Sequence, residues 1–168
     1  NEESILYFID ENTGKEIGYF GGIGQGPGEV IKVPTFTGMS PKKDTLYIHD
    51  FNARDMKIYY LNAKDSTVSF KFAYSKKLAN PLVDNLGTGY FTICRLKNGH
   101  YVGLSGLCHS DIFHVLDSDL NIVKRFGGFP LDGLTTDGST TNMTLSFMGN
   151  LVNHGNSIYY AANKFGYI

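Results

Sequence analysis

Short runs of aromatic and β-branched residues alternate along the chain with clusters of glycine, aspartate, asparagine and serine. Apolar runs of this length, bounded by turn-forming residues, predict β-strands, and no stretch repeats its apolar residues at helical spacing. The predicted strands fall into four groups, which span residues 5–20, 35–72, 90–126 and 144–168. The pattern therefore predicts an all-β fold in which the two middle groups each form a sheet of four antiparallel strands.

Landmark residues recur at a nearly constant interval, which indicates a structural repeat. Tyr47, Tyr101 and Tyr159 occupy matching strand positions at spacings of 54 (101 minus 47) and 58 (159 minus 101). The triplet at 20–22, Phe-Gly-Gly, returns at 126–128 after 106 residues (126 minus 20). An interval of about 50 residues with four short strands is typical of a β-propeller blade, a sheet that covers the face of its neighbour. The alternative is a two-sheet sandwich in which the periodicity arises by chance.

The segment 47–60 places Asp50, Asn52 and the basic residue Arg54 between two predicted strands. This arrangement resembles the NHL-type blade pattern, and the glycine-rich stretch 20–34 is similar to the connection between blades in TolB-like six-bladed propeller proteins of bacterial cell envelopes. The resemblance implies a six-bladed β-propeller to which this chain contributes. It also implies a protein that is periplasmic, secreted or membrane-anchored at the cell envelope, and it implies no particular activity.

The expected domain organisation is a single partial propeller domain over residues 1–168. It comprises an outer strand pair at 5–20, blades at 35–72 and 90–126, and an incomplete blade at 144–168. Six blades of about 50 residues need about 300 residues, so the sequence accounts for about three blades. Open blades would expose apolar sheet faces and edges. We therefore expect a part of a longer propeller, the preferred interpretation, or half of a ring completed by a second copy.

Composition narrows the classes of partner. The 20 glycines and the aromatic content of 14% favour strands and turns over helices. A formal net charge of −1 without a long Lys/Arg run argues against binding to nucleic acid or to an anionic membrane. No apolar run approaches the roughly 18 residues of a membrane-spanning helix, so no transmembrane segment is predicted. The two cysteines, Cys94 and Cys108, are interpreted as separate thiols, although one disulfide between them is the alternative.

The glycine-rich stretch 18–34 invites comparison with phosphate-binding loops, but its spacing excludes them. A dinucleotide-binding fingerprint would need glycine where Pro27 and Glu29 stand, and a Walker loop would need lysine at the position of Pro27. The β-branched residues that follow end at Pro34 and predict no helix to receive a phosphate. We expect a tight connection in which glycines adopt positive φ and pack against a neighbouring blade.

The turn after the strand at 45–49 contains Asp50, Asn52 and Asp55, which superficially resemble a metal-binding loop. The spacing lacks the glycine and the distal glutamate of an EF-hand. We therefore expect these side chains to hydrogen-bond the backbone of their own turn, and we expect Arg54 to brace the adjacent blade.

The densest group of potential metal ligands is His109, Asp111 and His114. Strand alternation predicts that Ile112 and His114 share one face while His109 lies in the preceding loop, so the group should not converge on a metal. The expected arrangement is an exposed turn with one packed histidine. Cys108 beside His109 does not by itself indicate a nucleophile activated by a base.

Propellers usually bind ligands at one end of the central channel, near the start of each innermost strand. The segments that lead to these strands contain four weak candidates for metal ligands, Glu29, Asn85, Asp137 and Asn142. Six-bladed hydrolases of the lactonase type hold calcium there with Glu, Asn and Asp ligands. The similarity is one of fold and residue type only, so it makes a calcium site a minor expectation and assigns no catalytic or cofactor-binding residue.

The function expected from these observations is a non-enzymatic binding or scaffolding module. Its loop faces would recognise a protein or glycan partner, because no nucleophile, acid/base pair or metal cluster stands at diagnostic spacing. One alternative is a calcium-dependent, lactonase-like hydrolase. Another is a purely structural segment of a larger protein, in which the partners are the remaining blades of the same chain or a second copy.

Overall fold

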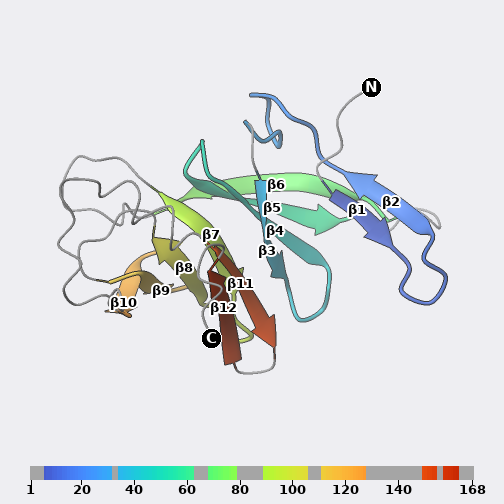
Figure 1. Cartoon of the computed structure of the whole chain (residues 1–168). Coiled ribbons are helices and arrows are strands. Elements are labelled where there is room, and N and C mark those ends of the chain that lie inside the picture. The colour runs from blue at the N-terminus through green and yellow to red at the C-terminus, as the bar shows by residue number, and fades with distance from the viewer. Residues whose placement is uncertain are drawn as a thin grey trace. The chain divides into compact units, whose positions relative to one another are not determined.

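The structure, a computed structural model, describes residues 6–31, 34–62, 68–78, 89–105, 111–127, 149–154 and 157–162. Twelve β-strands and no helix occur in these segments (Figure 1). The predicted all-β class is therefore confirmed. No helix in the described part of the chain is long and apolar enough to cross a membrane. The chain divides into two compact units, Asn1–Lys77 and Leu78–Ile168, and each is described by itself.

The first unit contains a two-stranded hairpin and a four-stranded sheet, both antiparallel (Figure 1). The hairpin consists of β1 (Leu6–Ile9) and β2 (Glu16–Phe20). The sheet has the order β3-β4-β5-β6, with strands β3 (Pro34–Met39), β4 (Thr45–Asp50), β5 (Asp55–Leu61) and β6 (Phe70–Lys77).

The hairpin packs its inner face on the sheet over β5 and β6. Phe8 stacks on Phe70 with ring centroids 5.4 Å apart, and Phe20 meets Tyr59 edge to face at 4.5 Å. The buried core of this unit is formed by Phe20, Val30, Leu46, Ile48, Tyr59 and Phe70. Val30 lies in the loop between β2 and β3, and the other core residues lie on one face of their strands, because side chains alternate between the two faces of a sheet.

The second unit repeats this plan with a second four-stranded sheet and a second hairpin (Figure 1). The sheet has the order β10-β9-β8-β7, with strands β7 (Tyr90–Arg95), β8 (Tyr101–Ser105), β9 (Phe113–Leu116) and β10 (Ile122–Phe126). The hairpin consists of β11 (Gly149–His154) and β12 (Ser157–Ala162). Strand β11 lies against β7. Phe113 meets Tyr160 at 5.2 Å, and the Asn153 side chain donates a hydrogen bond of 2.8 Å to the Arg95 carbonyl.

The two four-stranded antiparallel sheets confirm the strand number predicted for the middle groups. One predicted boundary was wrong, because β6 continues to Lys77 instead of ending at residue 72. Cross-strand pairing accounts for the difference, since Asp55 pairs with Lys77 and β5 therefore has a partner along its whole length. The arrangement of these sheets as blades of a propeller stays a prediction.

Candidate functional site

The turn between β4 and β5 holds the main cluster of charged side chains in the described residues. Asp50 ends β4, Asp55 begins β5, and the two are cross-strand partners. Lys57 follows two residues later on the same face, and Lys77 of β6 pairs with Asp55. Asp50, Asp55 and Lys57 are buried. Three neighbouring strands thus bring two acids and two bases together, and we call Asp50, Asp55, Lys57 and Lys77 the turn cluster.

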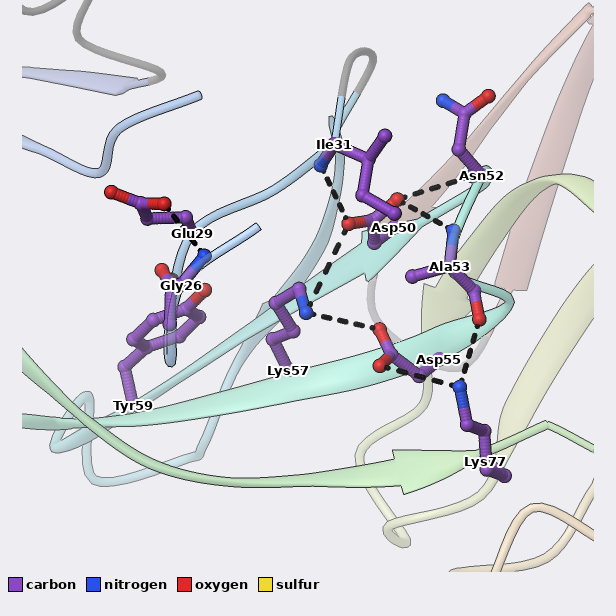
Figure 2. A network of polar contacts seen from close by, with 11 residues as sticks. Gly26, Glu29, Ile31, Asp50, Asn52, Ala53, Asp55, Lys57, Tyr59 and Lys77 are labelled. Atoms are coloured by element: carbon purple, nitrogen blue, oxygen red, sulfur yellow. Dashed lines mark hydrogen bonds and ion pairs between the residues drawn. The ribbon is translucent and has the colours of Figure 1, made fainter. Parts of the chain in front are cut away.

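Asp50 is fully buried and is satisfied by backbone N–H groups from two segments (Figure 2). Its Oδ1 accepts hydrogen bonds from the amides of Asn52, at 3.1 Å, and Ala53, at 3.0 Å, while its Oδ2 accepts one of 2.9 Å from Ile31. The prediction that Asp50 bonds its own turn is therefore confirmed. A carboxylate with three N–H donors is stabilised in its charged form and holds the turn in one conformation.

Asp55 does not bond the turn backbone as predicted, and it forms ion pairs instead. Its Oδ1 lies 3.5 Å from Lys57 Nζ, and its Oδ2 lies 3.8 Å from Lys77 Nζ. Lys57 Nζ also lies 3.9 Å from Asp50 Oδ2, so it stands between the two acids. Lys77 Nζ donates a hydrogen bond of 3.0 Å to the Ala53 carbonyl (Figure 2). Two carboxylates and two ammonium groups balance, which offsets the cost of burying charge.

The tip of this turn faces solvent. Asn52 and Arg54 are exposed, and Arg54 has a φ of 53°, in the left-handed region. The Asn52 side chain points away from the turn cluster, as Figure 2 shows. The cluster therefore fixes the backbone on which these polar side chains are displayed, whereas the predicted bracing of another blade by Arg54 stays a prediction.

Glu29, the one calcium-ligand candidate in a described segment, closes its own loop. Its Oε2 accepts a hydrogen bond of 2.7 Å from the Gly26 amide, and a Cβ placed on Gly24 would lie 2.1 Å from the same oxygen. Asn85, Asp137 and Asn142 lie outside the described residues. In the described segments no three His, Cys, Asp or Glu side chains gather closely enough to hold a metal ion. The minor expectation of a calcium site therefore stays a prediction.

The rest of the glycine-rich stretch behaves as the predicted tight connection. Gly28 has a φ of 80°, a Cβ there would lie 2.6 Å from Phe72 Cβ, and its carbonyl accepts a hydrogen bond of 3.1 Å from the Tyr59 hydroxyl. Gly21 also has a positive φ, of 86°. Positive φ is costly for residues with a side chain, so glycine is required by the path of the chain at these points.

His49, next to the turn cluster in sequence, is not among the candidate residues that the sequence indicates. It is fully buried, and neither ring nitrogen has a hydrogen-bond partner among the described residues. Burial lowers the pKa of His49 to about 4, although the nearby Asp50 carboxylate opposes the shift. Strand alternation places His49 on the face opposite to Ile48 and Asp50, but nothing in the sequence indicates that this face is buried.

His114 is the packed histidine that the sequence predicted. It is buried, as is Ile112, and its Nδ1 lies 3.0 Å from the Tyr90 hydroxyl with the two rings edge to face at 5.6 Å. Burial, and then the Arg125 charge, lower the pKa of His114. His109 and Cys108 lie outside the described residues.

Cys94 is a buried free thiol, as the interpretation of separate cysteines requires. Burial raises its pKa, which disfavours the reactive thiolate.

No protein-family model matches the chain, and no curated protein matches it. The resemblance to TolB-like and NHL-type propellers therefore stays a prediction.

Proposed function

We propose that this chain is a non-enzymatic binding or scaffolding module built from propeller-type blades, and that its exposed loops recognise a protein or glycan partner. The turn cluster is the observation that carries this proposal. Its four charged groups are bonded to the turn backbone or to one another, so they brace a loop instead of presenting a reactive group.

A braced loop favours recognition because binding does not have to order it. The Asp50 carboxylate fixes the amides of Asn52 and Ala53, and Lys77 holds the Ala53 carbonyl. Preorganisation of this kind lowers the entropy cost of association. The exposed Asn52 side chain then offers an amide donor and acceptor to a hydroxyl-rich glycan or to a peptide backbone.

The blade arrangement is supported by how the sheets stack within each unit. Hairpin β1–β2 packs face to face on β5 and β6, and in the other unit β11 lies against β7. Repeated antiparallel sheets that bury their faces against one another are typical of propellers. The six-bladed ring and the envelope location implied by the resemblance belong to the same proposal.

The test is binding of the purified chain to arrays of glycans and peptides. We expect binding to at least one class, and we expect Asn52→Ala to weaken it while the fold is retained. Lys42→Ala is the matched control, because Lys42 is exposed in the turn between β3 and β4, at the opposite end of the same sheet. Absence of binding to either array, or equal losses in the two variants, would contradict the proposal.

A further inference from the structure

Strand β6 forms one edge of the sheet β3–β6, and with eight residues it is the longest strand in the described part of the chain (Figure 1). Within the described residues β6 pairs with β5 alone. A hydrogen bond of 3.0 Å from the Val68 amide to the Ile17 carbonyl comes before the strand begins. The outer edge of a strand carries N–H and C=O groups that can pair with another strand, and proteins usually keep such edges short. The edge of β6 is therefore a template for an added strand.

The charge of this edge is positive. The sequence of β6, Phe-Lys-Phe-Ala-Tyr-Ser-Lys-Lys, contains three lysines and no acid. Lys71 is exposed, and the side chain of Lys77 is 78% exposed although it forms an ion pair with Asp55. The Asp55 side chain is only 7% exposed, so the base of this pair faces solvent and the acid does not. In a chain with a formal net charge of −1, β6 thus presents a local excess of positive charge.

The same edge exposes an aromatic ring beside its lysines. Tyr74 is 43% exposed, and Tyr60 of β5, which is 51% exposed, is the cross-strand partner of Lys71. A bulge at Ala73 shifts the register of β6 on β5 and brings Lys71 onto the same face as Tyr74. Burial, and then the neighbouring Tyr60, raise the pKa of Tyr74. Tyrosine is enriched among the residues that dominate binding, because its large ring has few rotatable bonds.

We propose that the partner is an extended acidic peptide segment that adds to β6 as a fifth strand of this sheet. The inference rests on the proposed function and names the chemistry of a protein partner. The backbone of the segment pairs with the outer edge of β6, its carboxylates face the lysines of the strand, and an apolar side chain packs on Tyr74. In strand addition the main-chain hydrogen bonds supply affinity, and the side chains on either face supply specificity.

Charge makes the acidic segment the favoured occupant. Lysine on an edge strand opposes pairing with a neutral or basic strand, which would desolvate or repel the ammonium groups. A strand that carries carboxylates turns the same charges into an attraction, so the edge accepts acidic segments and rejects others. Propeller blades stack face to face, so further blades would leave this edge of β6 as it is.

The test is fluorescence anisotropy with the chain and a short labelled peptide that alternates glutamate and valine. We expect this peptide to bind and its counterpart that alternates lysine and valine not to bind. Lys71→Glu should raise the dissociation constant roughly tenfold or more, because an attraction becomes a repulsion. Lys42→Glu is the matched control and should bind as the unaltered chain does. Lys42 is exposed in the turn between β3 and β4, the two strands of the sheet that are farthest from β6.

A second peptide separates strand addition from attraction by charge alone. The acidic peptide with N-methylated amides keeps its carboxylates and loses its backbone donors, so it should not bind. Undiminished binding after N-methylation would overturn the inference. No binding of the acidic peptide, equal binding of the basic peptide, or equal losses in Lys71→Glu and Lys42→Glu would overturn it as well.

The variant Asn52→Ala distinguishes this inference from the proposed function. Array binding that Asn52→Ala weakens, together with no binding of the acidic peptide, would overturn the added strand and leave the proposed function in place. Binding of the acidic peptide that Lys71→Glu weakens and Asn52→Ala leaves unchanged would support the added strand. It would also count against the turn between β4 and β5 as the recognition site.

Discussion

Two neighbouring buried residues, His49 and Asp50, differ sharply in how their polar atoms are satisfied. Asp50 accepts three backbone hydrogen bonds, whereas both ring nitrogens of His49 have no partner among the described residues. Alternation along β4 sends their side chains to opposite faces of the sheet. A buried imidazole without hydrogen bonds is costly when neutral and much more costly when protonated.

We predict that His49 makes the stability of the chain fall with pH below neutrality. The folded pKa of His49 is lowered to about 4 from 6.5, so between these values the unfolded state binds more protons than the folded state. The free energy of unfolding should therefore decrease as pH falls from 6.5 to 4, by roughly 3 kcal/mol at most. Urea unfolding at several pH values measures this slope.

The controls separate His49 from other titrating groups. His49→Leu should remove the part of this slope between pH 6.5 and 4 that His49 contributes and leave the part that belongs to His114, whose pKa burial also lowers. His100→Gln should keep the slope of the wild type, because His100 directly follows a turn and is not buried. Identical slopes for wild type and His49→Leu would show that His49 does not titrate in a buried, unpartnered state.

The sequence predicts residue-level chemistry only where the contacts are local. The bonds from Asp50 to the amides two and three residues on follow from the usual behaviour of aspartate in turns. The ion pair of Asp55 with Lys77 does not, because Lys77 is reached only through the register of β6 on β5. The burial of His49 could not be predicted either, since it depends on what covers that face of the sheet.

At the scale of elements, the glycine-rich loop between β2 and β3 packs closely against the core of the first unit. Val30 is fully buried at its end, and the amide of Gly24 donates a hydrogen bond of 2.9 Å to the Val30 carbonyl. The end of the loop therefore belongs to the core of the first unit. The glycines within the loop differ in how much space a side chain would find around them.

We predict that Gly28→Ala is strongly destabilising and that Gly22→Ala is close to neutral. At Gly28 the positive φ and the contact with Phe72 both penalise a side chain, whereas nothing lies within 4 Å of a Cβ on Gly22. The expected cost at Gly28 is about 2–4 kcal/mol, from backbone strain plus overpacking. Chemical denaturation of the two variants measures it, and similar stabilities would contradict the packed position of the loop.

Strand boundaries are predicted well where the apolar pattern is strong and poorly at the sheet edge. The predicted end of β6 at residue 72 was wrong because the strand continues through polar residues from Ser75 to Lys77. Edge strands commonly carry lysine, which protects them from pairing with other chains, so the apolar pattern fades before the strand does.

At the scale of the whole molecule, the all-β class follows from the sequence because short alternating runs and turn clusters recur along its length. The stacking of hairpins on sheets does not follow, because it depends on which aromatic faces meet. Phe8 on Phe70 and Phe113 on Tyr160 are contacts between segments far apart in the sequence.

Removal of calcium tests the hydrolase alternative on the whole chain. We expect the melting temperature to be the same with a chelator and with added calcium, because Glu29 is engaged with the Gly26 amide. If the folded chain bound calcium, the melting temperature would rise with the logarithm of the calcium concentration. A calcium-dependent rise that Glu29→Gln abolishes would instead support the hydrolase alternative and count against the proposed function.

The single carboxylate of Asp50 joins two segments that are distant in sequence, the end of the glycine-rich loop at Ile31 and the turn at Asn52 and Ala53. The two segments should therefore open together as one cooperative unit rather than fray separately. Native-state hydrogen exchange would then give the amides of Ile31, Asn52 and Ala53 a common opening free energy. In Asp50→Asn, which weakens acceptance from all three donors, these amides should lose protection in parallel.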